Sequence, residues 1–324
     1  MDSGGKSNEG FPAQAKLASS SPSSSSSTSG SLLNQLSMIN ARNFPALSLN
    51  QLPNKVTAFF GRKDIILEVT GRNWDGGGPI CLYGGKGTGK TSLSIELAHQ
   101  LEPKYPDAQF YIDLMGVGDK PLSVNKAMGH VLRAFAPKEP IPSDPAELTQ
   151  RYGMVLKGKK ILMLIENVSN TGQIKRLLPG KSSLMIFTSA TKVSFPGSFT
   201  KHVKEFFPDE AELLLFLLAP NAKRSASEIN DLCGYSPLAI SLAGSYLRED
   251  PDLPAEMLIR ALREEKLLLK PEGDFELAGD KDKKEVIDRN VEPIFSIIFR
   301  DMRKETATVF RKLALFSGPF DEKA

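Results

Sequence analysis

The sequence predicts an α/β fold, in which a parallel β-sheet is covered by helices on both faces and is followed by a small all-helical part. Three observations support this prediction. Between residues 79 and 206, short apolar runs alternate with helical stretches, as in successive right-handed βαβ units. A glycine-rich stretch, residues 84–91, separates the first apolar run from the first of these helices. After Pro208 the apolar residues recur at helical spacing throughout.

The glycine-rich stretch reads Gly84-Gly85-Lys86-Gly87-Thr88-Gly89-Lys90-Thr91. It fits G-x-x-x-x-G-K-[ST], the loop that holds phosphates in P-loop nucleoside triphosphatases. Residues 79–83 before it form an apolar run typical of a buried strand, and Leu93, Leu97 and Leu101 after it fall on one helical face. A plain glycine-rich turn with a surface lysine is the alternative, and both flanks argue against it.

The residue types in this loop suit phosphate binding. Glycines let the backbone curl so that successive N–H groups point at phosphate oxygens, and the following helix adds its unpaired N-terminal amides. We expect Lys90 to reach the β- and γ-phosphates and the Thr91 hydroxyl to ligate Mg²⁺. The residues expected to bind the nucleotide here are Gly84, Gly85, Gly87, Thr88, Gly89, Lys90, Thr91 and Ser92.

The other elements of the α/β part follow from the same patterns. A short helix is expected after a turn at Gly61. Ser123 and Asp144 are expected helix caps, and Pro145 suits a first helical turn. Residues 161–165 are apolar throughout, which is typical of a central parallel strand buried on both faces. In order, we expect a strand at 110–114, helices at 123–135 and 145–156, and strands at 160–165, 183–188 and 202–206.

The strand expected at residues 160–165 is followed by Glu166 and Asn167. P-loop proteins place an acidic residue here, where ligands of parallel sheets bind, to hold magnesium and water. Glu166 is therefore a candidate Mg²⁺ ligand, directly or through water, and forms the expected catalytic pair with Lys90. A strand that simply ends in polar residues is the alternative. Asn167 cannot act as a general base, so we expect tight nucleotide binding with slow or negligible hydrolysis.

The composition is that of an ordinary soluble globular protein of about two domains, with 324 residues, 40% hydrophobic and 24% charged. The net charge of +3 is too small to indicate nucleic acid or a membrane surface. Two cysteines, no secretory signal and no long apolar stretch favour a reducing, cytoplasmic location. An organelle transit peptide is the alternative interpretation of the serine-rich start, although no arginine precedes Arg42.

Composition also suggests where the domains begin and end. The start of the chain is a serine-rich, low-complexity segment with a weak helix signal at residues 31–39, and we expect it to be disordered. The all-helical part contains four expected helices, at 209–218, 225–232, 237–247 and 254–262. The expected segments are 1–50 (disordered, then a linker), 51–207 (nucleotide-binding α/β domain), 208–265 (helical subdomain), 266–290 (charged connection) and 291–324, where helical spacing returns.

Several motifs occur in a fixed order along the chain. They are Phe60-Gly61-Arg62, the phosphate loop, residues 105–114, Ile165-Glu166-Asn167, Leu177-Leu178-Pro179, Phe187-Thr188-Ser189 and residues 233–239. From about residue 53 onward, the chain thereby resembles an NB-ARC domain of the STAND class of signalling P-loop ATPases. That class includes plant resistance proteins, the apoptosome scaffold and many bacterial regulators. The resemblance is strongest to bacterial-type members, in which tetratricopeptide repeats often follow.

The resemblance implies further roles for individual residues. Gly61 and Arg62 match a pair that lies beside the adenine and ribose. Pro237 matches a proline of the helical subdomain that packs on the base and closes the ADP-bound form; without the resemblance, it would be only a first-turn helix proline. Residues 313–316 look like the opening of a winged-helix subdomain, which the chain is expected to contain only in part.

Three departures from the family pattern bear on function. Glu166 stands where an aspartate is usual. Ala190 stands where an arginine normally senses the γ-phosphate, and nearby Lys192 does not replace its planar fork. With the winged helix incomplete, the family's histidine that contacts the ADP β-phosphate has no counterpart. Structural or exposed roles are expected instead for His99, His130 and His202.

The function indicated by these features is a signalling switch that binds ADP or ATP with Mg²⁺ and associates with protein partners or with itself. An active P-loop ATPase and a non-cycling nucleotide-binding fragment of a larger regulator are the alternatives. Co-purified ADP would favour a switch, and rapid turnover would favour an enzyme. The basic residues between 300 and 312 are scattered on helices, as on a solvated face, so nucleic-acid binding is not expected.

Overall fold

The computed structural model describes residues 49–56, 59–74, 76, 78–115, 121–268 and 290–313. All of them belong to one compact unit, Ala46–Ala324. The predictions for residues 1–48, for most of the charged connection at 266–290 and for residues 314–324 lie outside the described residues. In the described part of the chain, no helix is both long and apolar enough to cross a membrane.

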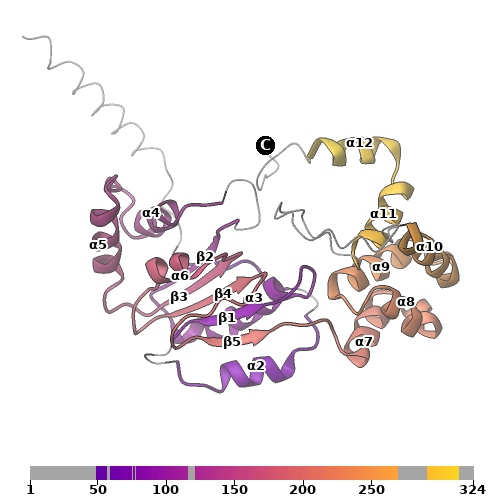
Figure 1. Ribbon diagram of the computed structural model, residues 1–324, viewed down its shortest axis with the longest axis horizontal. Helices are drawn as coiled ribbons and strands as arrows, with labels where there is room; N and C mark the ends of the chain where they lie inside the picture. Colours follow the sequence, from indigo (N-terminus) through magenta and orange to yellow (C-terminus); the bar gives the residue numbers. More distant parts are fainter. Residues whose placement is uncertain are drawn as a thin grey trace, which may run out of the picture. The chain divides into compact units, whose positions relative to one another are not determined.

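Within the described residues, five strands form one sheet in the order β2-β3-β4-β1-β5, and every pair of neighbours is parallel (Figure 1). The predicted parallel sheet is therefore confirmed. The strands are β1 (Ile80–Tyr83), β2 (Ala108–Asp113), β3 (Ile161–Glu166), β4 (Leu184–Ser189) and β5 (Phe199–His202).

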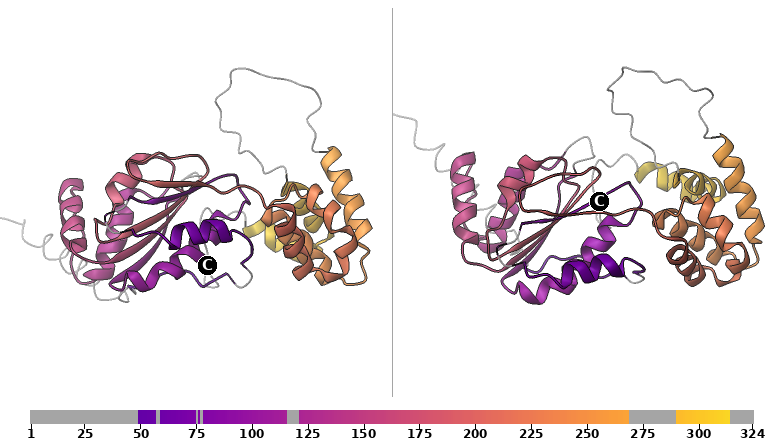
Figure 2. Two further views of the ribbon diagram at one scale, coloured as in Figure 1. Left: turned by 90° about the horizontal axis from the view of Figure 1, so that it is seen from below. Right: turned by 60° about the horizontal axis from the view of Figure 1, so that its bottom comes forward.

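Helices cover both faces of this sheet, as Figures 1 and 2 show. On one face, α2 (Lys63–Thr70) and α3 (Lys90–Leu101) pack on alternate residues of the strands, such as Leu82 and Leu164. On the other face lie α4 (Val124–Phe135), α5 (Pro145–Leu156) and α6 (Thr171–Leu177). All six residues of β3 are buried, as expected for an interior parallel strand.

Local signals explain where most of these helices begin. The Ser123 hydroxyl accepts a hydrogen bond from an amide of the first turn of α4, and the Asp144 carboxylate accepts two from α5, so both predicted caps are confirmed. Helix α6 was not predicted, although Asn170 and Gln173 form a capping box at its start. Its seven residues span only two turns, too few for a clear hydrophobic period.

The predicted edge strand at residues 202–206 is placed too late in the chain, because the structure ends β5 at His202. Val203 still donates a hydrogen bond to the Tyr83 carbonyl (2.7 Å), after which the backbone leaves the sheet. By Phe206 its amide donates to the Tyr235 carbonyl of the helical part instead (2.9 Å). The apolar residues at 203 and 206 therefore belong to a connection between two cores rather than to a strand.

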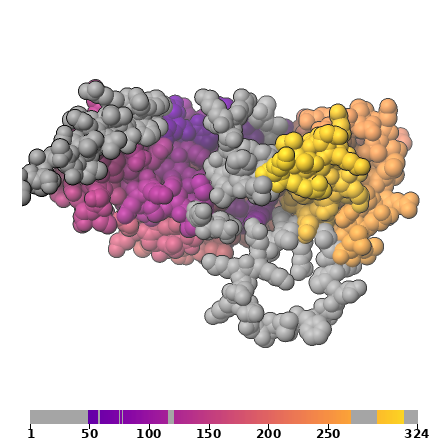
Figure 3. Space-filling view, turned by 90° about the horizontal axis from the view of Figure 1, so that it is seen from above, coloured from indigo at the N-terminus to yellow at the C-terminus, as the bar shows by residue number. Residues whose placement is uncertain are grey.

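The helical part has a hydrophobic core of its own, built on Leu215, Ile229, Ile240, Leu247 and Leu258. The charged connection was predicted to begin at residue 266, but the helix α10 (Ala255–Leu268) continues past that residue. Its charged residues include Glu265, whose carboxylate lies 2.7 Å from the guanidinium of Arg300. Of the last two helices, which are yellow in Figure 3, α11 (Glu292–Asp301) packs against α10. The elements are α7 (Pro208–Leu218), the 3₁₀ helix η2 (Pro220–Ser225), α8 (Ala226–Leu232), α9 (Pro237–Glu249), α10 (Ala255–Leu268), α11 (Glu292–Asp301) and α12 (Lys304–Leu313).

Two helical glycines test how tightly the helical part is packed. A Cβ atom on Gly244 of α9 would lie 2.6 Å from Cβ of Leu218, whereas one on Gly153 of α5 would meet nothing within 4 Å. We expect Gly244→Ala to lower the free energy of unfolding by about 1–3 kcal/mol, because the crowding outweighs the gain in helix propensity. Gly153→Ala should raise it by about 0.5–1 kcal/mol, as measured by urea denaturation. Stabilisation by both substitutions would show that α7 and α9 pack loosely.

Candidate functional site

The phosphate loop connects the end of β1 to the start of α3, and its shape requires glycine at two positions. A Cβ atom on Gly84 would lie 2.2 Å from the carbonyl oxygen of Val203, so no larger residue fits there. Gly89, the residue that caps α3, has φ = 86°, in the left-handed region that glycine adopts without strain. The backbone therefore curls through the loop and leads directly into the first amides of α3.

Lys90 is the first residue of α3, and its side chain folds over this loop. The ammonium nitrogen donates a hydrogen bond to the Gly85 carbonyl (2.6 Å), and the Thr88 hydroxyl donates to the same oxygen (3.0 Å). Burial lowers the pKa of Lys90, and the nearby carboxylate of Glu166 acts in the opposite direction. The structure therefore places a half-buried cation beside the loop amides, as a phosphate-binding role demands.

Glu166, the last residue of β3, is only 2% exposed and accepts hydrogen bonds from three hydroxyl groups. Thr91 and Thr188 donate to Oε2 (2.8 and 2.6 Å), and Ser94 donates to Oε1 (2.6 Å). A carboxylate offers about four acceptor positions, so roughly one remains, on Oε1. The pair of Thr91 and Glu166 can thus hold Mg²⁺ through the Thr91 hydroxyl and a water bound to Glu166, with phosphate oxygens completing the shell.

Asn167 follows Glu166 with φ = 59°, and its side chain turns toward the neighbouring strand β2. The Asn167 amide group donates to Oδ1 of Asp113 (2.9 Å), the last residue of β2, and the Met115 backbone N–H donates to the same oxygen (2.7 Å). The sequence interpretation missed Asp113 as a site residue. A signal was present, because Asp113 ends its strand in register with Glu166.

Arg62 precedes α2 and is 7% exposed. Its guanidinium donates to the main-chain carbonyls of Thr88 (3.2 Å), Lys204 (2.5 Å) and Glu205 (3.4 Å), and it lies 4.7 Å above the ring centre of Phe206. Burial lowers the pKa of Arg62 despite the nearby carboxylates. The guanidinium donors are therefore directed mainly at the protein backbone.

The same corner is joined to α7 through Glu210. One carboxylate oxygen of Glu210 accepts the backbone N–H of Arg62 (2.9 Å), and the other accepts that of Phe207 (3.0 Å). Gly61 has φ = 70°, in the left-handed region that favours glycine, and a Cβ atom there would also displace the Glu210 carboxylate, since it would lie 2.4 Å from Oε1. Gly61 and Arg62 thus tie the α/β part to the start of the helical part.

A pocket of about 130 Å³ lies between these residues and the start of α3. Its walls combine aromatic and apolar side chains with residues of the phosphate loop. An apolar pocket beside a phosphate loop has the character of a site for a nucleotide base. The lining includes Phe59, Phe60, Arg62, Thr88, Gly89, Ser92, Phe206 and Pro237, which brings together three of the predicted nucleotide contacts with Arg62 and Pro237.

The helical part contacts the phosphate loop directly through the start of α9. The Leu238 backbone N–H donates to the Gly87 carbonyl (3.2 Å), and the Ser236 hydroxyl donates to the same oxygen at 3.5 Å. Pro237 lies beside Gly89, its Cγ atom 4.0 Å from the position of a glycine Cβ. A change in the loop therefore reaches α9 through one main-chain hydrogen bond and through the Ser236 hydroxyl.

Other candidates lie apart from this constellation. Ala190 and Lys192 are exposed on the connection after β4. Each histidine has a local partner: His99 contacts Glu102 and the Pro53 carbonyl, His130 contacts Gln51, and His202 stacks on Tyr83. These contacts agree with the structural or exposed roles expected for the three histidines.

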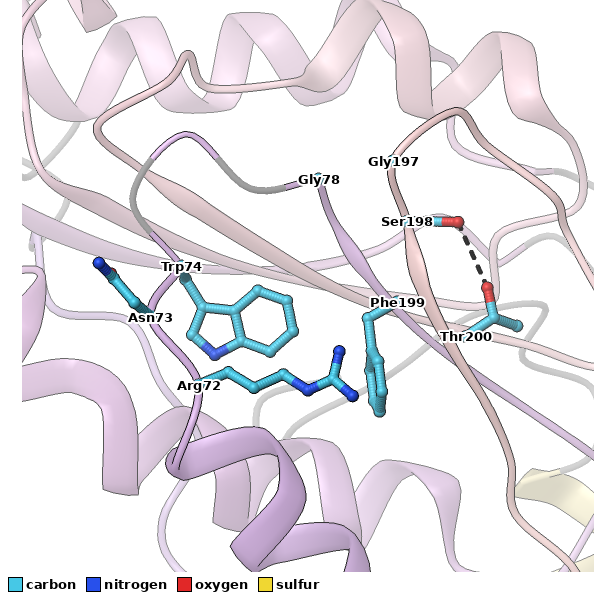
Figure 4. A pocket seen from close by; sticks show the side chains of 8 residues that line it. All are labelled: Arg72, Asn73, Trp74, Gly78, Gly197, Ser198, Phe199 and Thr200. Carbon is cyan, nitrogen blue, oxygen red and sulfur yellow. Dashed lines mark hydrogen bonds between the residues drawn. The ribbon is translucent and has the colours of Figure 1, made fainter.

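A second, open pocket lies at the opposite end of the sheet, where Phe199 begins β5 (Figure 4). The guanidinium of Arg72 lies 4.3 Å above the centre of the Phe199 ring, and the Trp74 ring meets Phe199 edge to face, with centroids 5.8 Å apart. Because ligands of parallel sheets bind at the carboxyl ends of the strands, this pocket is not part of the candidate site.

Comparison with known proteins is consistent with this arrangement. The chain is 30% identical over 287 residues to Regulatory protein AfsR of Streptomyces coelicolor and 30% identical over 282 residues to that of Streptomyces griseus. Each match covers 83% of this chain but 28% of the relative, so the chain spans about a quarter of the length of these regulators. No protein-family model matches the sequence.

Among solved structures, the chain is similar to a STAND protein with a tetratricopeptide repeat sensor from Pyrococcus horikoshii. The TM-score is 0.54 at 15% identity, over 86% of this chain and 38% of that one. The fold is thus the parallel-sheet P-loop fold of the STAND proteins, and the resemblance that the sequence motifs suggested is confirmed.

The buried network around Glu166 yields a stability prediction. Thr188→Val keeps the shape of the side chain but removes a hydroxyl that donates to Glu166 and accepts the Asn167 N–H (3.1 Å). We expect the free energy of unfolding to fall by roughly 1–3 kcal/mol, because buried groups lose their partner. Thr191→Val, at an exposed position, should change it by less than about 0.5 kcal/mol. Equal urea midpoints for both variants would contradict this account.

Proposed function

We propose that this chain, which has the STAND P-loop fold and is related over most of its length to AfsR regulators, is a nucleotide-dependent switch. It binds ADP and ATP with Mg²⁺ and hydrolyses ATP slowly or not at all. The observation that carries the proposal is the pair of hydrogen bonds from Leu238 and Ser236 to the Gly87 carbonyl. Through these bonds, the helical part responds to the state of the phosphate loop.

The phosphates are held by the loop amides and by Lys90, in the arrangement that the loop shape supports. The Thr91 hydroxyl would ligate Mg²⁺, and Glu166 would act through a bound water because three hydroxyl groups occupy most of its acceptor positions. When bound, the ion neutralises charge on the phosphates. Glu166 and Lys90 are therefore the residues proposed to act on the triphosphate.

The base occupies the pocket that Arg62, Phe206 and Pro237 line. Aromatic rings and a proline in its lining supply apolar contacts to a flat base. Arg62 contributes mainly by shaping this pocket, since its guanidinium hydrogen-bonds to main-chain carbonyls. Pro237 closes the pocket from α9, as the family resemblance implies.

A switch needs a ligand that binds its two states with different affinity. ADP favours the arrangement in which α9 contacts the loop, and exchange for ATP opens it for association with protein partners or with a second copy. Asn167 cannot serve as a base and Ala190 offers no cation to the γ-phosphate, so the ATP state is long-lived.

Two other functions are distinguished by simple measurements. An active ATPase would turn over at roughly 1 s⁻¹ or faster, the ordinary range for enzymes. A non-cycling fragment of a larger regulator would bind nucleotide without a change of conformation. For all of these functions, we propose the subdomain limits given by the sequence, which are 51–207, 208–265 and 291–324. In this division, α11 and α12 are the first helices of a winged-helix subdomain.

Two lysines of the phosphate loop provide a matched test of binding. We expect Lys90→Ala to abolish measurable binding of ADP and ATP in calorimetry, because it removes the cation beside the loop amides. Lys86→Ala, which removes an exposed lysine of the same loop, should leave affinity within about threefold of the parent. Mass analysis of nucleotide retained on purification provides the same comparison. Nucleotide retained equally by both variants would refute the site assignment.

Hydrogen exchange at the start of α9 tests the switch itself. The Leu238 amide is hydrogen-bonded to Gly87 in this structure, so its exchange reports directly on the contact between α9 and the loop. We expect protection with ADP and Mg²⁺, and exchange at least about tenfold faster with a non-hydrolysable ATP analogue. The amide of Leu148 in α5, remote from the site, serves as the control. Equal protection of Leu238 in both complexes would favour the non-cycling fragment.

A further inference from the structure

Two polar side chains lie at the carboxyl ends of β2 and β3. The carboxylate that could act on water is on β2, and the residue after β3 carries an amide instead. Asn167, beside Glu166, carries an amide, and Asp113, across the strand pair, carries the carboxylate. The Asn167 amide group donates to Asp113 at 2.9 Å. Asn167, which cannot activate water, is therefore hydrogen-bonded to Asp113, whose carboxylate can accept a hydrogen bond from water.

Asp113 lies on the same face of the sheet as the phosphate-loop helix. It is in register with Glu166, and neighbouring residues of parallel strands that are in register point to the same face. Glu166 contacts Thr91 and Ser94 of α3, which fixes that face as the one covered by α3. Tyr111, two residues before Asp113, also packs with the α3 core.

The titration of Tyr111 agrees with this placement. Burial, together with the negative charges of Glu166 and Asp113, raises the pKa of Tyr111 to about 12. The phenol therefore experiences both carboxylates from one side of the sheet.

Among the residues that the structure describes, hydrogen-bond donors reach one of the two carboxylate oxygens of Asp113. The Asn167 amide group and the Met115 N–H both donate to Oδ1, and no hydrogen bond reaches Oδ2 from the described residues. These two donors hold the carboxylate in one orientation and leave Oδ2 as an acceptor. This is the form of group that orients an attacking water, with its lone pair directed at phosphorus.

We propose that Asp113 orients the water that attacks the γ-phosphate of bound ATP, and that Asn167 is a positioning residue that holds Asp113. This inference rests on the proposed nucleotide site and assigns the residual hydrolysis of that site to a residue on β2. The water oxygen bonds to the γ-phosphorus as the bridging P–O bond breaks. The bond electrons leave with ADP, and the water proton passes to an oxygen of the released phosphate.

The substitution Asp113→Asn tests this role with little change of shape. The amide would direct an N–H where Oδ2 accepts, so the water would turn its lone pair away from phosphorus. We expect hydrolysis of pre-bound ATP in a single turnover to slow about 100-fold, the loss expected for a misplaced reactant. ADP affinity in calorimetry should remain within about threefold of the parent. Aluminium fluoride, which with ADP mimics the attacked phosphate, should bind the ADP complex of this variant at least about tenfold more weakly.

Asp107 provides the matched control, because it is a carboxylate at the other end of β2 that accepts the Lys160 N–H (2.7 Å). Asp107→Asn should leave both the hydrolysis rate and the fluoride complex unchanged. The exchanged pair Asp113→Asn with Asn167→Asp restores a hydrogen bond of reversed direction and a free carboxylate oxygen. We expect it to recover at least about tenfold of the lost rate, since aspartate tolerates the left-handed backbone at 167.

Three results would overturn the proposal while nucleotide binding persists. They are a parental rate in Asp113→Asn, no recovery in the exchanged pair, and a parent protein that hydrolyses no bound ATP at all. Absence of ADP and ATP binding by the parent would instead refute the proposed function, so the two failures are distinguishable.

Discussion

The site depends on one buried carboxylate. Glu166 ends an interior strand, and three hydroxyl groups from α3 and β4 satisfy it, so the sheet, the loop helix and the next strand are fixed to one another at a single point. Burying a charge without hydrogen-bond partners costs a large free energy. Each of the three hydroxyl groups is therefore needed for folding as well as for the chemistry of the site. This point also fixes the position of the phosphate loop, because Thr91, which donates to Glu166, lies only two residues after Gly89.

A second set of contacts joins the loop to the helical part, and every acceptor in it is a main-chain carbonyl. Leu238 donates to Gly87, and the Arg62 guanidinium donates to carbonyls on the loop and on the connection between β5 and α7. The bond from the Leu238 amide to Gly87 links two backbone segments directly, so a displacement of the loop reaches α9 without passing through a flexible side chain. In the proposed switch, the phosphates therefore need to move the loop only slightly to change the contact with α9.

The sequence predicted the sheet and the loop well because their signals are local. A strand, a glycine-rich turn and an amphipathic helix are each specified within a few residues, as around Lys90. What it missed depends on contacts between distant segments. Asp113 becomes a site residue only through its register with Glu166, 53 positions later, and the binding of Arg62 to main-chain carbonyls arises from residues more than a hundred positions away. Helix α6 was missed for a different reason, its short length.

In the proposed switch, slow hydrolysis follows from how the carboxylates are distributed. Glu166 is engaged by three hydroxyl donors, and Asn167 beside it offers only an amide. The remaining carboxylate, Asp113, lies one strand away and is already bonded to two N–H groups through one oxygen. A water bound to Asp113 would be oriented by a single acceptor and would not be deprotonated by a nearby base. Hydrolysis of ATP would therefore be slow but still possible. The proposed switch would benefit from this arrangement, because the lifetime of its ATP state would have to exceed the time that its partners need to assemble.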